Sequence, residues 1–140
     1  MKKNLLHIFM VTFCMMLMTI TAQAQCYIIG SDGSWHTNVA SAELQATGTE
    51  GVYEGVVAFS NGSQYFTVVT KLTENDNDWE GLSLYRYGPD FNDEMLTLNT
   101  PMTMYAKKDA SFMMPAADGT YRIHVDFNTN KITILGNFPK

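Results

Sequence analysis

Two histidines are the first candidates for chemistry in the chain beyond its N-terminal segment. His36 follows a loop of small residues, and His124 lies in a stretch that alternates apolar and polar residues. Neither has a cysteine or a carboxylate at the spacing of a zinc site. The chain also holds no nucleophile elbow, zinc-protease helix motif or phosphate-binding glycine loop. We therefore predict that both histidines are surface residues, and that the protein is non-catalytic and uses no cofactor or metal.

An acidic run at residues 74–81 is the second candidate, because its carboxylates partly match a calcium-binding loop. Asp76, Asp78 and Glu80 precede a glycine, but Tyr87 stands where an EF-hand needs its bidentate glutamate. The run is therefore not an EF-hand, and a weak calcium site of another kind is left as an alternative. A small hydrolase would need these carboxylates to converge across a cleft. The simplest interpretation is a solvated loop between two strands.

Exposed tyrosines are the third candidate, because a flat aromatic ring stacks well against the C–H face of a sugar. We predict a strand over residues 82–87 in which Leu82 and Leu84 face the core. Tyr85 and Tyr87 would then face water, ~7 Å apart, since they are two strand positions from each other. Two rings at that separation can stack against neighbouring sugar units.

Two tryptophans extend this aromatic pattern. Trp79 lies just before the predicted strand, and Trp35 follows a loop of serine, aspartate and glycine. Clustered exposed Trp and Tyr side chains are typical of binding surfaces. The alternative interpretation is that Trp79 covers the core and that the register of the strand is reversed, which would bury both tyrosines.

These side chains must be positioned by β-strands, because a period of two dominates the sequence and no window keeps a helical period. Turns rich in Gly, Asn, Asp and Pro interrupt the alternation about every ten residues. A helical turn is expected only at Val39–Ala46. The predicted strands are Cys26–Gly30, Val52–Phe59, Tyr65–Lys71, Leu82–Tyr87, Glu94–Leu98, Thr103–Ala106, Ser111–Met114, Thr120–Phe127 and Lys131–Leu135.

The last two predicted strands form the clearest hairpin. Residues facing the core should alternate with residues facing water, and Asn128-Thr129-Asn130 should turn the chain. Many short strands joined by close turns predict an all-β, single-domain antiparallel β-sandwich, immunoglobulin-like or carbohydrate-binding-module-like, with a closed barrel as the alternative. The inward set is Tyr121, Ile123, Val125, Phe127, Ile132 and Ile134, and the outward set is Arg122, His124 and Asp126.

Length and charge limit the classes of partner. The 140 residues predict one domain. Nine basic and fourteen acidic residues give a net charge of −5, and removal of Lys2 and Lys3 would leave seven against fourteen, or −7. A chain this acidic repels phosphate backbones and anionic lipids, so we expect neither nucleic-acid nor membrane-surface binding. The 12% aromatic and 16% charged content also argues against disorder.

The N-terminal segment has the features of an export signal. Lys2 and Lys3 precede an apolar run over residues 8–20, and Ala22-Gln23-Ala24 forms a small-x-small cleavage motif. The run is shorter than the roughly 20 residues of a membrane-spanning helix. We therefore predict a secretory signal peptide at 1–24 and a β-sandwich domain at 25–140, without a transmembrane span in the mature chain.

Cys26 is the single cysteine expected in the mature chain, because Cys14 lies within the signal peptide. No intramolecular disulfide can then form. Lipid attachment at Cys26 is one alternative, although Gln25 occupies the position where a lipoprotein signal has a small residue. The simpler prediction is that Cys26 begins the first strand and is partly buried.

Four segments, taken in order, resemble the carbohydrate-binding modules of the SusE/SusF family, the starch-binding accessory proteins of Bacteroidetes outer membranes. Tyr27-Ile28-Ile29-Gly30 followed by Trp35 is similar to the opening strand and loop of that family. The other three are Gly51-Val52-Tyr53-Glu54-Gly55 through Tyr65-Phe66-Thr67-Val68-Val69, then Asn77-Asp78-Trp79, and the closing hairpin Gly119–Ile134.

The resemblance implies a β-sandwich that binds glycans without catalysis and works at the cell surface beside a glycan importer. Family modules bind through an arc of Trp and Tyr helped by polar side chains. The positions in this chain that would fill those roles are Trp35, Trp79, Tyr85 and Tyr87, with Arg86 or Lys71 as hydrogen-bond donors.

We therefore expect an exported, non-catalytic carbohydrate-binding module of the cell envelope. Its place would be the periplasm, the outer-membrane surface or the extracellular space, and its partner an oligo- or polysaccharide. The alternative is a structural or protein-interaction subunit of the same fold, which contacts other envelope proteins and binds no glycan. That alternative predicts buried aromatic rings, or an exposed strand edge that pairs with another protein.

Overall fold

The computed structural model describes residues 25–137, so the predicted signal peptide lies outside the described residues. Within this part of the chain no helix is long and apolar enough to cross a membrane. The elements are β1 (Cys26–Ile29), β2 (Ala42–Ala46), β3 (Val52–Ala58), β4 (Tyr65–Val69), α2 (Trp79–Ser83), β5 (Arg86–Gly88), β6 (Glu94–Met95), β7 (Met102–Thr103), β8 (Tyr105–Ala106), β9 (Phe112–Met113), β10 (Thr120–Asp126) and β11 (Lys131–Asn137).

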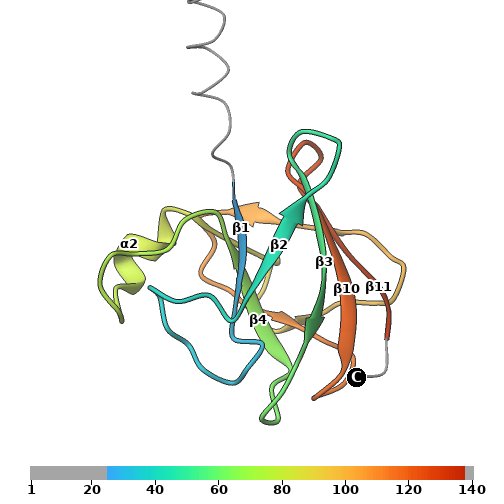
Figure 1. Ribbon diagram of the computed structural model, residues 1–140, viewed down its shortest axis with the longest axis horizontal. Coiled ribbons are helices and arrows are strands. Elements are labelled where there is room, and N and C mark those ends of the chain that lie inside the picture. Colours follow the sequence, from blue (N-terminus) through green and yellow to red (C-terminus); the bar gives the residue numbers. More distant parts are fainter. Residues whose placement is uncertain (1–24, 138–140) are drawn as a thin grey trace, which may run out of the picture.

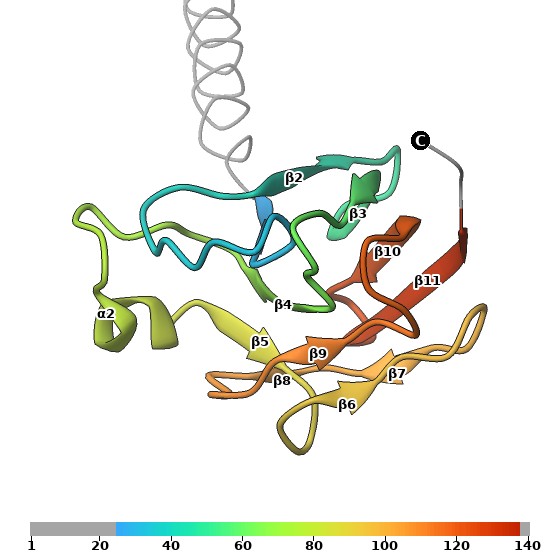
Figure 2. The same ribbon diagram turned by 90° about the horizontal axis from the view of Figure 1, so that it is seen from below.

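The strands are linked into one curled sheet (Figures 1 and 2). Its order is β6-β9-β4-β1-β2-β3-β10-β11-β7, with β5 and β8 branching from β4. The β6–β9 pair is parallel, and the other pairs in the described part of the chain are antiparallel. The prediction of an all-β fold is therefore confirmed. The finer prediction of an antiparallel sandwich is not, because the sheet is continuous and contains a parallel pair.

The curl begins at β2, which changes partners along its length. Its first half pairs with β1, and Gln45 and Ala46 pair with β3. Leu44 is the last residue that pairs with β1, and its side chain is buried in the main core. The prediction of a helical turn over Val39–Ala46 is therefore wrong at this strand. Its Ala, Glu, Leu and Gln residues favour helix, but pairing on both sides outweighs a preference of a few tenths of a kcal/mol per residue.

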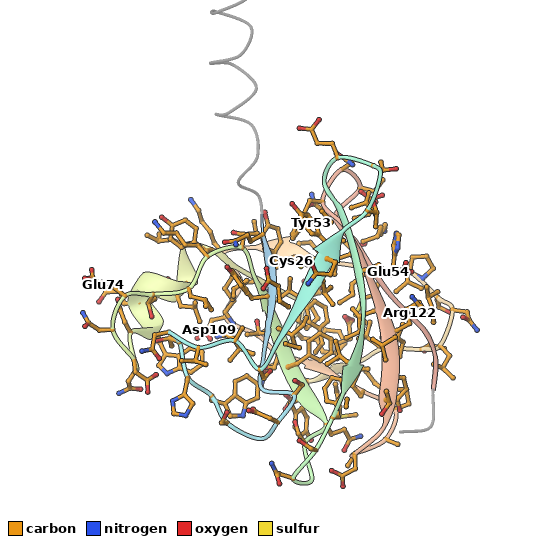
Figure 3. The ribbon with its side chains drawn as sticks, in the orientation of Figure 1. Cys26, Tyr53, Glu54, Glu74, Asp109 and Arg122 are labelled. Carbon is orange, nitrogen blue, oxygen red and sulfur yellow. The ribbon has the colours of Figure 1, made fainter. Side chains whose placement is uncertain are left out.

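The main core fills the inside of the curl. It combines side chains of β1, β3, β4, β9, β10 and β11, and Figure 3 shows Cys26 and Tyr53 among them. Figure 3 also shows Glu54 and Arg122 on the outer side of β3 and β10. The predicted closing hairpin is confirmed: the inward residues of β10 and β11 are buried, and Asn130 makes the turn at a φ of 54°. Phe127, just past β10, is half-buried against this core.

A second, smaller cluster lies on the outer face of β1 and β4. Ile29, Val69 and Leu82 are its buried members, and the half-buried Trp79 packs against it. Because alternate residues of a strand face opposite ways, β1 sends Ile28 into the main core and Ile29 into this cluster. Both faces of the sheet are therefore covered where α2 lies.

The strand predicted over residues 82–87 is wrong in its first half. Asp78 instead caps a helix that starts at Trp79, and its carboxylate accepts a hydrogen bond from the amide of Gly81 at 2.9 Å. Strand β5 begins only at Arg86. The helix shifts the pattern of burial, so Leu84 is exposed rather than buried.

Most other predicted strands are present but shorter. The strand predicted over 94–98 is reduced to β6, and that over 103–106 is divided into β7 and β8 around the buried Met104. β6 and β7 form the two ends of the strand order, β8 pairs with β5, and each of the three pairs over two residues.

Candidate functional site

Trp35 and Trp79 come together on the outer face of the sheet. Trp35 lies in the loop after β1, Trp79 is the first residue of α2, and their ring centroids are 6.4 Å apart with the planes inclined by 45°. Trp35 is 36% exposed, whereas Trp79 is half-buried against the second cluster. The pair therefore presents one accessible ring that is backed by another.

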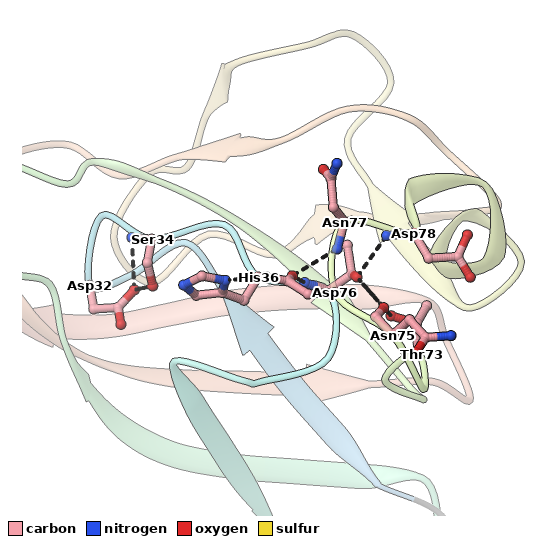
Figure 4. A network of polar contacts seen from close by, with 9 residues as sticks. Asp32, Ser34, His36, Thr73, Asn75, Asp76, Asn77 and Asp78 are labelled. Carbon is pink, nitrogen blue, oxygen red and sulfur yellow. Dashed lines mark hydrogen bonds and ion pairs between the residues drawn. The ribbon is translucent and has the colours of Figure 1, made fainter.

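The Trp35 ring rests on a bare stretch of backbone. A β-carbon at Gly30 would lie 2.7 Å from Cζ2 and Cη2 of Trp35 and 2.9 Å from the carbonyl oxygen of Tyr65. Gly30 also has a φ of +106°, which side chains rarely adopt. The following turn is closed by Asp32, whose carboxylate accepts hydrogen bonds from the amide and hydroxyl of Ser34 at 3.0 and 2.7 Å (Figure 4).

The loop that carries Trp35 is joined by hydrogen bonds to the loop that precedes Trp79. Thr37 is fully buried, and its amide donates to Asp76 Oδ1 at 3.1 Å. Its hydroxyl donates to the carbonyl of Asn75 at 3.2 Å and accepts from the amide of Asp78 at 3.0 Å. Figure 4 shows the residues of the acidic loop that take part, including Asn75, Asp76 and Asp78. The run at 74–78 is thus a docked loop rather than a freely solvated one.

Asp76 and His36 form an exposed pair beside this junction, with 2.7 Å between Oδ2 and Nδ1 (Figure 4). The hydrogen bond from His36, followed by one from the amide of Asn77, lowers the pKa of Asp76. His36 is a surface residue, as predicted, but its contact with the acidic run was not anticipated. Nothing in local sequence spacing indicates a contact across 40 residues.

Arg86 lies beneath Trp79 rather than on the surface. Its guanidinium carbon is 5.6 Å from the centroid of the Trp79 ring, and the residue is only 7% exposed. Nε donates to Thr67 Oγ1 at 2.9 Å, Nη1 to Asp109 Oδ1 at 2.7 Å, and Nη2 to Ser111 Oγ at 3.2 Å. Burial lowers the pKa of Arg86, and Asp109 opposes that shift. Arg86 therefore supports the tryptophan through a cation–π contact.

Tyr85 and Tyr87 do not join the tryptophan pair. Tyr85 is 37% exposed, and Lys71 Nζ lies 5.3 Å from its ring centroid, beside an open depression of about 400 Å³. Tyr87 turns inward, with its ring centroid 5.1 Å from that of Phe127. The expectation that both tyrosines face water side by side is therefore wrong, because the strand starts later than predicted.

Two carboxylates of the acidic run, those of Asp76 and Asp78, have structural roles. Asp76 holds the Thr37 loop, Asp78 caps α2, and Glu80 is exposed in the first helical turn. Among residues 25–137, no group of three or more His, Cys, Asp or Glu side chains is placed to hold a metal ion.

Tyr65 is an exposed ring that the sequence analysis did not single out. It is 39% exposed and starts β4, where alternation places it on the same face as Thr67, the partner of Arg86. Its carbonyl also adjoins Gly30, on which Trp35 rests. The alternation of Tyr65, Phe66 and Thr67 could have identified this outward ring.

No protein-family model, curated protein or solved structure matches the chain. Its function must therefore be inferred from the paired tryptophans, the neighbouring Tyr65 and the residues that hold them.

Proposed function

We propose that the protein is a secreted, non-catalytic carbohydrate-binding module. The observation that carries this proposal is the Trp35–Trp79 pair, with rings 6.4 Å apart on one face of the sheet. An exposed indole offers a flat apolar surface to the C–H face of a sugar, while its N–H can donate to a hydroxyl. Nothing in the main core requires Trp35, which is absent from both buried clusters.

The three aromatic residues would have different tasks. Trp35, the most accessible of the tryptophans, would stack against one sugar ring, and Tyr65 would extend the surface across β4. Trp79 would support Trp35 from behind. Its own position is fixed by the cation–π contact with Arg86 and by packing against the second cluster. A surface of this size favours weak monovalent binding to a glycan chain.

The resemblance to the SusE/SusF family is part of this proposal, together with a place in the cell envelope. On the same resemblance, we assign the curled sheet to the sandwich-like folds of carbohydrate-binding modules. What supports that assignment is the core, where Phe66 of β4 and Ile123 of β10 belong to the same buried cluster.

Native affinity electrophoresis in gels that contain single soluble polysaccharides tests the proposal. At least one polysaccharide should retard the wild-type protein, and Trp35→Ala should remove the retardation. Tyr105→Ala, which removes a ring of similar exposure on β8, should leave it unchanged. A folded wild-type protein that no polysaccharide retards would contradict the proposal.

A second candidate is a protein-interaction subunit of the envelope. The observation that favours it is the edge strand β6, where Met95 is 49% exposed and Phe91, just before it, is 62% exposed. Edge strands with exposed apolar residues are prone to pair with other chains. A defined envelope protein that binds the wild type but not Met95→Arg, with no glycan retention, would favour this candidate.

A further inference from the structure

The contacts between the Trp35 loop and the loop that precedes Trp79 form a polar latch, which we define as Thr37 and Asp76 with their partners Thr73, Asn75 and Asp78. We propose that this latch is a positioning device: it fixes the separation and tilt of Trp35 and Trp79 before a ligand arrives. The inference rests on the proposed glycan-binding function, because it assigns new positioning residues to that surface.

Thr37 is the centre of the latch and uses every polar group it has. Its amide and hydroxyl bind Asp76, Asn75 and Asp78, as described above. Its carbonyl accepts from the amide of Thr73 at 3.0 Å, and the hydroxyl of Thr73 lies 2.7 Å from its Oγ1. A fully buried threonine needs such partners, because a buried polar group without a hydrogen bond destabilises the fold.

The latch lies next to both rings in the chain. Trp35 precedes Thr37 by two residues, and the Asp78 amide that binds the Thr37 hydroxyl belongs to the residue directly before Trp79. Asp78 also caps α2 through its carboxylate, so the same residue fixes the first helical turn, where Trp79 lies. Movement of either loop would therefore change the geometry of the ring pair.

Fixing the rings in advance has a consequence for binding. Ordering a loop or a large side chain on association reduces affinity, and a preorganised surface avoids this loss. Loss of the latch should thus weaken glycan retention by about tenfold, which corresponds to ~1.4 kcal/mol. It should do so without removing either ring.

Far-ultraviolet circular dichroism tests the latch without any ligand, because two indoles held close together at a fixed tilt give an exciton couplet. Trp35→Phe and Trp79→Phe calibrate the signal, since each removes one partner. Thr37→Val keeps the shape but removes the hydroxyl, and Thr37→Ser restores the hydroxyl. Asp76→Ala breaks the latch from its exposed side, and it serves as the second variant if Thr37→Val does not fold.

We expect a couplet in the wild type and in Thr37→Ser, and a clearly smaller one in Thr37→Val and Asp76→Ala with cooperative unfolding retained. An unchanged couplet in these two variants, a loss in Thr37→Ser equal to that in Thr37→Val, or no couplet in the wild type would overturn the proposal.

Glycan retention is the second measurement, made with the polysaccharide that retards the wild type. Retention of Thr37→Val equal to that of the wild type would overturn the role of the latch in binding. If no glycan retards the wild type, the proposed glycan-binding function is contradicted. The couplet then still tests whether the latch fixes the two rings.

Discussion

The indole of Trp35 packs directly against Gly30. A β-carbon at position 30 would come within 2.7 Å of two ring carbons of Trp35, which is closer than such atoms can approach. The exposed ring of the candidate site is therefore seated on a residue that has no side chain. Gly30 directly follows β1, so the Trp35 ring packs against backbone next to the sheet.

Replacement of Gly30 by alanine should therefore displace Trp35 and destabilise the fold. The methyl group meets both the indole and the carbonyl of Tyr65, and the backbone has a φ of +106°. Strain of this kind costs about 1–3 kcal/mol. Urea unfolding should show the loss of stability, and tryptophan fluorescence should shift to the red. Gly48→Ala, where nothing lies within 4 Å, is the matched control. Equal stability of the two variants would contradict this packing.

Asp76 should make stability depend on acid. Its pKa is lowered by the hydrogen bond from His36, so the ionised form favours the folded state. That contribution is complete above the unfolded value of ~3.9 and is lost as pH falls through the lower folded value. The difference in urea midpoint between wild type and Asp76→Asn should therefore shrink as the pH falls below about 4. A difference that does not shrink below that pH would contradict this linkage.

Cys26 should be chemically inert in the folded protein. Burial, followed by the nearby charge of Glu43, raises its pKa to about 12, and its side chain is fully covered. Since the thiolate is the reactive form, iodoacetamide at about pH 8 should leave the native protein unmodified and should label it in concentrated urea. Mass spectrometry distinguishes the two results. Rapid labelling of the native protein would show that the sulfur is not in the core. Cys26 begins the first strand, as predicted from the sequence. It is fully buried, whereas partial burial was expected.

Asp109 should matter only while Arg86 is present. The guanidinium is buried and the carboxylate is 92% exposed, so the acid serves to neutralise the buried charge. Asp109→Ala should lower the urea midpoint of the wild type, because it leaves a buried cation without its counter-ion. In an Arg86→Met background, which replaces the charge by an apolar chain, the same change should have almost no effect. A similar loss in both backgrounds would show that Asp109 acts independently of Arg86.

The parts of the fold that follow from local pattern could be predicted from the sequence. In the β10–β11 hairpin, residues such as Ile123 and Val125 alternate with polar ones, and Asn130 supplies the left-handed turn. Strand β2 could not be predicted in this way, because its residues favour helix and only pairing with β1 and β3 makes it a strand. Helix α2 had a local signal, Asp78 followed by Glu80, that resembles a helix start.

The residue types of the candidate site could be predicted from the sequence, but their arrangement in space could not. Trp35 and Trp79 were singled out as exposed aromatic candidates, but their contact depends on a latch between distant loops. Tyr87 was expected to face water because a strand was assumed to start at Leu82, and the helix removes that register. Which rings share a surface is decided by tertiary contacts that no short window contains.

A glycan microarray probed with the wild-type protein and Trp35→Ala side by side is the most direct test of carbohydrate binding. A group of chemically related glycans should bind the wild type and lose their signal with Trp35→Ala, while Tyr105→Ala keeps it. Equal binding of wild type and Trp35→Ala, or a folded wild type that binds no glycan on the array, would contradict the proposal.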